Sequence, residues 1–293
     1  MDDYILTNAV RALLDIPGAT LLMLPRLLID DLFRARIEHH ISDPVVRSFW
    51  IHEYAGYSTN FRTEAISPIQ NKIGKALMEP RLRNMLAQPT STITPRRLMD
   101  EGAIVICNLS KGRLGESTAH LLGALLTTAF AQAALSRADT PLADRRIFHF
   151  YADEFQSFAT ESFALILSEA RKYALTLCTG HQYLAQLSDQ LRAAVFGNVG
   201  SIIACRPGAE DAAILARQIG LASSEALLDL PNFSGWARLL QNGIPTSPIR
   251  LDLYDAPRAR RSSTHRLIDT SRLRFGRPRA EVERRIREFL GVQ

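Results

Sequence analysis

The sequence predicts an α/β fold with a largely parallel sheet, preceded by a helical segment. Two patterns carry this prediction. After residue 100, short apolar runs rich in strand-forming residues alternate with helical stretches. Before residue 100, apolar residues recur at helical spacing with no strand alternation. The composition is 46% hydrophobic and 22% charged, which is typical of a globular chain and excludes wholesale disorder.

Residues 1–95 are the predicted helical segment. Asp43-Pro44 and Ser67-Pro68 each place a capping side chain before a proline, a combination that favours the first turn of a helix. We therefore expect helices to begin at both points.

Residues 96–254 are the predicted α/β domain. Its expected strands are 103–109, 147–151, 174–179 and 201–205, with two later strands at 236–240 and 249–253. Its expected helices are 117–136, 162–173, 183–195 and 210–219. In open parallel sheets, functional side chains gather at the carboxyl ends of the strands, so the residues that follow these strands are the candidates for chemistry.

Residues 255–293 form a basic tail in this division of the chain. They hold 11 arginines and five acidic side chains, whereas the first 254 residues hold 24 basic and 25 acidic ones. Within the tail, only residues 281–290 have a helical pattern. An arginine-rich tail can bind phosphates or acidic partners, or it can be a solvated chain end. The sequence leaves both interpretations open.

Two further features concern the compartment. Cys107, Cys178 and Cys205 lie in apolar runs without CxxC spacing, which predicts small buried residues in a reducing compartment and no zinc site or disulfide framework. Residues 117–136 carry no charge and are long enough to span a bilayer, but polar residues such as His120 and Gln132 dilute them. We expect a buried helix in a soluble, cytoplasmic protein.

Asp153 and Glu154 directly follow the expected strand 147–151. Adjacent carboxylates at the exposed end of a buried strand suit nucleotide hydrolysis, because the first can organise Mg²⁺ through water and the second can polarise the attacking water. A strand that ends in two solvated acids is an equally open interpretation of these residues alone.

Three nearby residues are candidates with simpler alternatives. Gln182 follows the next strand, where an amide can sense a γ-phosphate or hold water, or merely cap a helix. His181 is expected to form local hydrogen bonds, since no partner has metal-ligand spacing to it. Arg171 ends the helix at 162–173, where it favours the helix dipole or acts as an arginine finger on a neighbouring subunit.

A phosphate-binding loop is missing from the 293 residues. Ser110–Gly115 precedes a helix and resembles such a loop, but it fails the G-x-x-x-x-G-K-[ST] pattern because Lys111 comes before Gly112. We expect this segment to be a turn, with contact to DNA or nucleotide as the alternative.

In combination, these residues resemble the C-terminal half of the TraG/TraD-type coupling ATPases of conjugative type IV secretion, in the HerA/FtsK superfamily. The matching strings are IVICNLSKGRLGE (104–116), FHFYADEFQSFATESFALILSEARKYAL (148–175), HQYLAQL (181–187) and AVFGNVGSIIACRPGAEDAAILA (194–216), supported upstream by FWIHEY (49–54) and NKIGKAL (71–77).

This resemblance implies a partial RecA-like P-loop NTPase core. Asp153 and Glu154 match the Walker B pair, with Asp153 binding Mg²⁺ through water and no direct protein cage for a metal. Gln182 matches the glutamine that senses nucleotide state, and Arg171 matches the finger that reaches the adjacent protomer. Residues 1–95 resemble part of the all-alpha insertion domain.

The resemblance also implies partners and a location. Members of this family are homo-hexamers that pump single-stranded DNA, recruit the relaxosome through a TraM-like accessory protein, and connect it to the type IV secretion channel. They are anchored in the inner membrane through N-terminal helices, for which this chain has no counterpart, with the motor in the cytoplasm.

The missing Walker A loop departs from that pattern. We expect a fragment or a truncated product, as opposed to a chain whose other half is supplied elsewhere. The intact family member uses ATP and Mg²⁺, and neither is expected to bind tightly to this chain alone. The expected function is the C-terminal motor portion of a coupling protein, a DNA-translocating ATPase that is not competent unaided. The alternatives are a non-catalytic module that binds relaxosome proteins or coupling-protein subunits, and a DNA-binding fragment that uses its basic tail.

Overall fold

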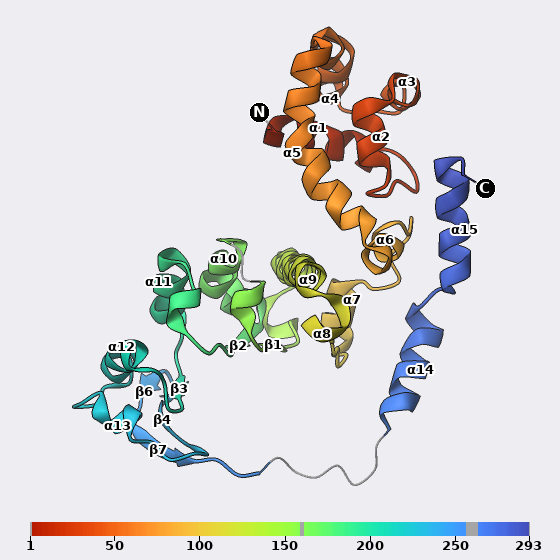
Figure 1. Cartoon of the computed structure of the whole chain (residues 1–293). Helices are drawn as coiled ribbons and strands as arrows, with labels where there is room; N and C mark the ends of the chain where they lie inside the picture. Colours follow the sequence, from red (N-terminus) through yellow and green to blue (C-terminus); the bar gives the residue numbers. More distant parts are fainter. Residues whose placement is uncertain (1, 159–160, 256–262, 293) are drawn as a thin grey trace. The chain divides into compact units, whose positions relative to one another are not determined.

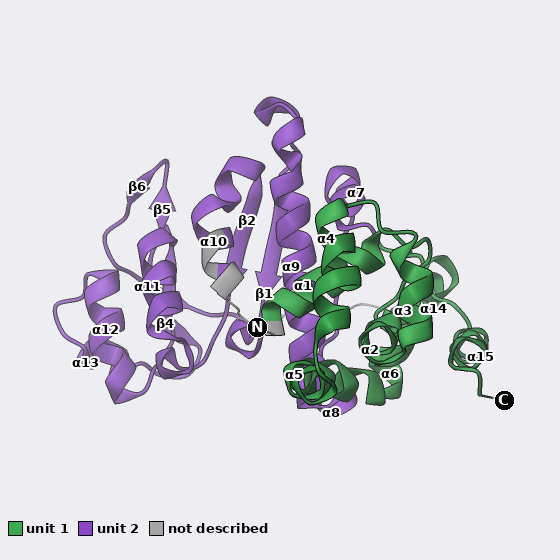
Figure 2. Cartoon of the chain, turned by 90° about the horizontal axis from the view of Figure 1, so that it is seen from above, with its two compact units in different colours: residues 1–93, 263–293 green, residues 94–262 purple. Residues whose placement is uncertain are grey.

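The structure is a computed structural model that describes residues 2–158, 161–255 and 263–292 (Figure 1). The chain divides into two compact units, shown in different colours in Figure 2. A helical unit contains Met1–Ile93 and Ser263–Gln293, and a mixed unit contains Thr94–Ser262. The sequence-based division set residues 255–293 apart, whereas residues from 263 onward are grouped here with the helical unit.

The helical unit is built around a cluster of buried aromatic side chains. Phe49, Trp50 and Tyr54 lie on one π-helical turn and contact one another, with ring centroids 4.8–5.9 Å apart. The Tyr54 hydroxyl donates to the Leu28 carbonyl at 2.8 Å. The unit comprises α1 (Asp2–Leu14), α2 (Met23–Ile29), α3 (Asp31–Glu38), α4 (Pro44–Ser48), η1 (Phe49–Tyr54), α5 (Thr59–Met78), α6 (Pro80–Leu86), α14 (Thr264–Phe275) and α15 (Arg279–Leu290).

One of the two predicted helix starts is confirmed and the other is wrong. Asp43 caps α4, accepting from the Val45 amide at 2.8 Å, with Pro44 in the first turn. Pro68 instead lies inside α5, whose cap is Ser58. A helix tolerates an internal proline when packing compensates for the lost hydrogen bond. In α5 that packing comes from buried residues on both sides of Pro68: Ala65, Ile66, Ile69, Ala76 and Leu77.

The C-terminal segment is folded onto the helical unit. Val282 and Ile286 of α15 are buried against Leu22 and Leu77 in a hydrophobic cluster. The predicted helix at 281–290 is thus confirmed as α15. The sequence-based expectation missed α14, because none of its residues is buried and its apolar residues give no clear periodic face.

The mixed unit begins with three helices and continues as alternating strands and helices. Its elements are α7 (Pro95–Glu101), α8 (Lys111–Leu114), α9 (Glu116–Ser136), η2 (Arg137–Asp139), η3 (Leu142–Asp144), β1 (Phe148–Ala152), η4 (Phe155–Ser157), α10 (Glu161–Glu169), η5 (Ala170–Tyr173), β2 (Leu175–Thr179), η6 (Leu184–Gln186), α11 (Asp189–Asn198), β3 (Ile202–Ala204), α12 (Ala209–Ile219), α13 (Glu225–Leu228), β4 (Ser234–Arg238), β5 (Leu240–Gln241), β6 (Ile244–Pro245) and β7 (Ile249–Asp252).

The sheet is smaller and less parallel than expected. β1 and β2 form a parallel pair, in register from Phe148 opposite Leu175 to Ala152 opposite Thr179. β3, β4 and β7 form a separate antiparallel sheet, and β5 pairs with β6. The expectation of a largely parallel sheet therefore holds only for β1 and β2, because β3 takes its partner from the late strand β4.

The predicted strand at 103–109 is wrong. Residues 103–110 have no ladder partner, and Ile104 and Ile106 are 93% and 84% exposed. An apolar run rich in strand formers becomes a strand only when another strand satisfies its backbone groups. No described segment does so here.

Among the described residues, helices cover one face of the β1–β2 pair. Helices α9, α10 and α11 lie beside β1 and β2 (Figure 1). Their side chains form one hydrophobic core with residues of the strands, among them Phe130, Phe163 and Leu191 of the helices. The other face is exposed, including Tyr151 and Cys178. All three cysteines are exposed, so the prediction of buried cysteines is wrong. The residue type alone did not reveal that Cys178 lies on the uncovered face of the strands.

Helix α9 serves as a core helix of the mixed unit. It is the one described helix that is long and apolar enough to cross a membrane by length and composition. Residues along it are nonetheless buried within the unit, including Ala119, Thr127, Phe130 and Ala134.

Candidate functional site

Two loops meet at the carboxyl ends of β1 and β2. They contain Asp153-Glu154 and Gly180–Gln182. The Gly180 amide donates to the Ala152 carbonyl at 2.8 Å, and the Phe155 amide donates to the Gly180 carbonyl at 3.1 Å. These bonds continue the strand pairing beyond the strands, so the two loops are held side by side.

Both carboxylate oxygens of Glu154 accept hydrogen bonds from side-chain amides. Gln182 Nε2 donates to Oε1 from the second loop. Gln156 Nε2 donates to Oε2 from the same loop as Glu154. The structure thus brings together Glu154 and Gln182, which the sequence placed at neighbouring strand ends. A carboxylate held on both oxygens has a defined orientation, as a group that positions water requires.

The backbone of Glu154 has a left-handed conformation, with φ 52° and ψ 41°. For a residue with a Cβ atom this conformation costs about 1 kcal/mol, and such strain is concentrated at functional sites. The Glu154 amide donates to Asp153 Oδ1 at 3.1 Å, which stabilises the turn. A Cβ atom at Gly180 would lie 3.3 Å from the same oxygen, so the glycine allows the two loops to approach closely.

Asp153 is exposed beside this turn, and its binding of Mg²⁺ through water stays a prediction. Among the described residues, no group of three or more His, Cys, Asp or Glu side chains could hold a metal directly.

His181 lies half-buried behind the carboxylates. Its ring meets the Phe155 ring edge-on, with centroids 5.3 Å apart. Burial lowers the pKa of His181 below its ordinary value of 6.5, while the negative charges of Asp211 and Glu154 oppose the shift. Asp211 is itself buried and accepts from the Leu184 amide at 3.0 Å. The sequence predicted local hydrogen bonds for His181. Among the described residues, its ring instead contacts the Phe155 ring.

Arg171 lies at the other end of the strands. It belongs to η5, which comes before β2, whereas Glu154 and Gln182 follow the strands. A five-residue strand spans about 13 Å between its end residues, so Arg171 is not beside the carboxylates of its own chain. Its side chain is exposed and has no hydrogen-bond or ion-pair partner among the described residues.

The segment Ser110–Gly115 forms a short helical turn. α8 covers Lys111–Leu114, and Gly115 follows it with φ 80°. The Lys111 ammonium is 3.8 Å from the Glu116 carboxylate. A contact of this turn with DNA or nucleotide stays a prediction.

Sequence analysis did not identify the side chains that support the carboxylate loop from α9. His120 Nδ1 is within hydrogen-bond distance of the Ser157 carbonyl. A Cβ atom at Gly123 would lie 2.9 Å from Phe158, so this glycine allows Phe158 to approach α9 closely. Gln156 was also missed, although its position two residues after Glu154 could have suggested it.

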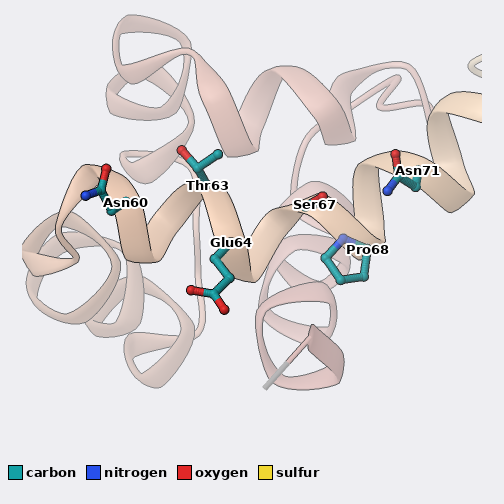
Figure 3. Close-up of a pocket in the computed structure, with 6 residues that line it drawn as sticks. All are labelled: Asn60, Thr63, Glu64, Ser67, Pro68 and Asn71. Carbon is teal, nitrogen blue, oxygen red and sulfur yellow. The ribbon is translucent and has the colours of Figure 1, made fainter.

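A hollow of about 590 Å³ lies over one face of α5 in the helical unit (Figure 3). Its lining has helical spacing along α5 and consists of Asn60, Thr63, Glu64, Ser67, Pro68 and Asn71. Pro68 has no amide hydrogen, so the Glu64 carbonyl lacks its usual helical donor. None of the predicted site residues lines this hollow.

The fold and the site together define a mixed α/β protein. Its small parallel sheet has two carboxylates and an amide at the carboxyl ends of its strands. Among solved structures, the chain is similar to a bacterial conjugative coupling protein, TrwBdeltaN70, in its unbound monoclinic form, with a TM-score of 0.61. The aligned region has 14% sequence identity and covers 89% of this chain. It covers 64% of the other chain, so this chain spans less than two thirds of that protein.

The likeness to TrwBdeltaN70 is one of fold. No protein-family model matches the chain, and no curated protein matches it in sequence. At this level of identity, function must be argued from the site itself.

Proposed function

We propose that this chain is the C-terminal motor portion of a conjugative type IV secretion coupling protein, an ATP-driven DNA translocase with a partial RecA-like core. The observation that carries the proposal is the pairing of Gln182 with Glu154 at the ends of parallel strands β1 and β2. The fold likeness to a coupling protein supports it.

In this proposal each site residue has one task. Asp153 would hold Mg²⁺ through water, and Glu154 would orient the attacking water. Gln182 donates a hydrogen bond to Glu154 and would sense the state of the nucleotide through that contact. Arg171 reaches the nucleotide of the next subunit, which its position away from its own carboxylates favours. ATP binding depends on a phosphate-binding loop, which the 293 residues do not contain.

The proposal implies macromolecular partners. These are single-stranded DNA, a relaxosome component such as a TraM-like accessory protein, the secretion channel and further copies of the chain in a hexamer. Work on DNA would take place at the cytoplasmic face of the inner membrane.

The main test is Glu154→Gln in a polypeptide that joins this chain to a phosphate-binding segment. We expect DNA-stimulated ATP hydrolysis to fall at least about 100-fold, because the group that orients water loses its charge, while ATP binding is retained. Glu225→Gln, at an exposed position of α13, is the matched control. Undiminished turnover in Glu154→Gln would falsify the assignment.

A mixing experiment tests the position of Arg171. Subunits with Glu154→Gln and subunits with Arg171→Ala are each expected to be inactive alone. If Arg171 acts across a subunit boundary, mixed oligomers regain part of the activity, because some boundaries combine an intact Glu154 with an intact Arg171. Absence of any recovery in verified mixed oligomers contradicts a role in the neighbouring site.

The lack of a phosphate-binding loop in these residues favours a second candidate, a non-catalytic module that binds relaxosome proteins or coupling-protein subunits. Calorimetric titration of the chain with ATP and with an accessory protein separates the two. Accessory-protein binding, together with no ATP hydrolysis in the joined polypeptide, supports this second candidate.

A further inference from the structure

The turn that carries Arg171 is held by two other arginines. η5 ends with the carbonyl groups of Lys172 and Tyr173. The Lys172 carbonyl accepts from Arg145 Nη1, and the Tyr173 carbonyl accepts from Arg137 Nη1 at 3.1 Å. The Arg145 guanidinium also lies over the Tyr173 ring, 5.5 Å from its centroid. Cationic donors thus satisfy the carbonyl groups at the end of this turn, where helical hydrogen bonding stops.

Arg137 is the centre of this arrangement. It is 1% exposed, although arginine is rarely buried without partners. Its Nη2 donates to the Arg146 carbonyl at 2.6 Å, and its Nε donates to Asp100 Oδ1 at 3.1 Å. One guanidinium therefore joins α7, the end of α9, the residues before β1, and η5.

A third arginine, Arg96 of α7, binds residues next to Arg137. Arg96 donates to Asp100 at 2.6 Å and to Asp139 at 2.8 Å. The hydrogen bond from Arg96 holds the pKa of the Asp139 carboxyl below its ordinary value. Arg145 Nε donates to the Thr140 carbonyl at 2.7 Å, so the residues after α9 hold Arg145 in turn.

Arg171 contrasts with these neighbours. Arg96, Arg137 and Arg145 each make several hydrogen bonds inside the unit, whereas the Arg171 side chain is exposed and has no such bond to a described residue. The backbone next to it is constrained, since Ala174 has φ 54° and its carbonyl accepts from the Phe148 amide at 2.9 Å. The turn is therefore fixed on its inner side and presents one unpaired guanidinium outward.

We propose that Arg137 and Arg145 are positioning residues that clamp the turn Ala170–Tyr173 and so fix the direction in which Arg171 leaves the subunit. The functional part rests on the proposed role of Arg171 in a neighbouring nucleotide site. The clamp itself is a property of this chain and can be measured without nucleotide.

The first experiment is hydrogen–deuterium exchange on the full chain with Arg145→Gln. Arg145 is partly exposed, so this variant is expected to keep its fold. Loss of a charge-assisted hydrogen bond and the ring contact should make amides in residues 170–174 exchange at least about 10-fold faster. Peptides from α11 should be unchanged. Arg192→Gln is the matched control, because Arg192 forms its ion pair with Asp189 within α11. Unchanged exchange at 170–174 in Arg145→Gln overturns the clamp.

The second experiment measures steady-state ATP hydrolysis in the polypeptide joined to a phosphate-binding segment. Arg145→Gln should lower kcat and leave KM for ATP nearly unchanged, since a finger acts mainly on the transition state. Adding Arg145→Gln to Arg171→Ala should lower kcat no further, and Arg137→Lys should resemble Arg145→Gln.

The outcomes separate the two proposals. Faster exchange with unchanged kcat overturns the positioning role. Independent, multiplying losses in the double variant also overturn it. If Arg171→Ala itself leaves kcat unchanged, the proposed role of Arg171 fails, and the exchange data still decide whether the clamp exists.

Discussion

At the scale of single residues, the site is organised around the Glu154 carboxylate. Its backbone is left-handed, both of its oxygens accept amide hydrogen bonds, and its neighbour Asp153 faces solvent. The Glu154 carboxylate is therefore oriented by the protein, whereas the Asp153 carboxylate accepts the Glu154 amide and is exposed to solvent. The proposed function assigns the metal-organising role to Asp153 and the water-orienting role to Glu154.

The environment of His181 leads to a prediction about pH. Burial lowers its pKa in the folded state, so between the folded and unfolded pKa values the unfolded chain binds more protons. The free energy of unfolding should therefore fall as pH drops through about 6.5 and below. Urea unfolding of wild type and His181→Gln at pH 5 and pH 7.5 measures this difference.

The variant should lose less stability on acidification than wild type does. His265→Gln, at an exposed position of α14, is the control and should behave as wild type. Equal losses in wild type and His181→Gln contradict a role for the buried imidazole.

Part of the site could be predicted residue by residue. The rule that chemistry gathers at the carboxyl ends of parallel strands led to Glu154 and Gln182, and the structure places them in contact. The hydrogen bonds of Arg137 could not be predicted, because they join it to residues up to 37 positions away in the sequence. No local pattern distinguishes a buried arginine from an exposed one.

At the scale of elements, α9 supports the site through a glycine on its surface. The absence of a side chain at Gly123 lets Phe158 approach the helix, and Phe158 follows the carboxylates and η4 along the chain. The expected helix at 117–136 is confirmed as α9, but its sequence did not reveal why a glycine stands in its middle.

Replacing this glycine should therefore destabilise the protein. A Cβ atom at position 123 would lie 2.9 Å from three Phe158 atoms, so Gly123→Ala should lower the free energy of unfolding by about 1–3 kcal/mol. Gly197→Ala in α11 is the matched control, because nothing lies within 4 Å of its Cβ position. There the higher helix propensity of alanine should stabilise by up to about 1 kcal/mol. Urea unfolding followed by Trp236 fluorescence tests both, and stabilisation of equal size in both variants contradicts the packing role.

Local sequence patterns predicted an element well where the residues of that element alone carry the pattern. α9, α12 and α15 have long helical patterns, and the structure contains all three. At 183–195 the pattern set the helix start too early, because Ser188 caps α11 (Asp189–Asn198) by accepting from the Leu191 amide. The pattern failed at 103–109, since strand formation depends on a partner elsewhere in the fold.

At the scale of the whole molecule, the two ends of the chain build one helical unit. α15 packs on residues near the start of the sequence through Val282 and Ile286. The stability of this unit thus depends on a segment that follows the entire mixed unit along the chain.

Truncating Ile286 tests this dependence. Ile286→Ala should lower the free energy of unfolding of the helical unit by about 2–4 kcal/mol, because it opens a cavity beside Leu22 and Leu77. Leu273→Ala in α14 should be nearly neutral, since Leu273 is 88% exposed. Trp50 fluorescence during urea unfolding, in a Trp236→Phe background, reports on this unit alone. A neutral Ile286→Ala would show that α15 is not part of the folded unit in solution.

The left-handed backbone of Glu154 has an evolutionary consequence. Folding alone would favour glycine or asparagine at this position, because both adopt the left-handed region more readily. In a lineage released from the need to orient water, drift should replace the glutamate without harm to the fold. The identity of residue 154 in descendants of this chain therefore indicates whether selection still acts on the carboxylate.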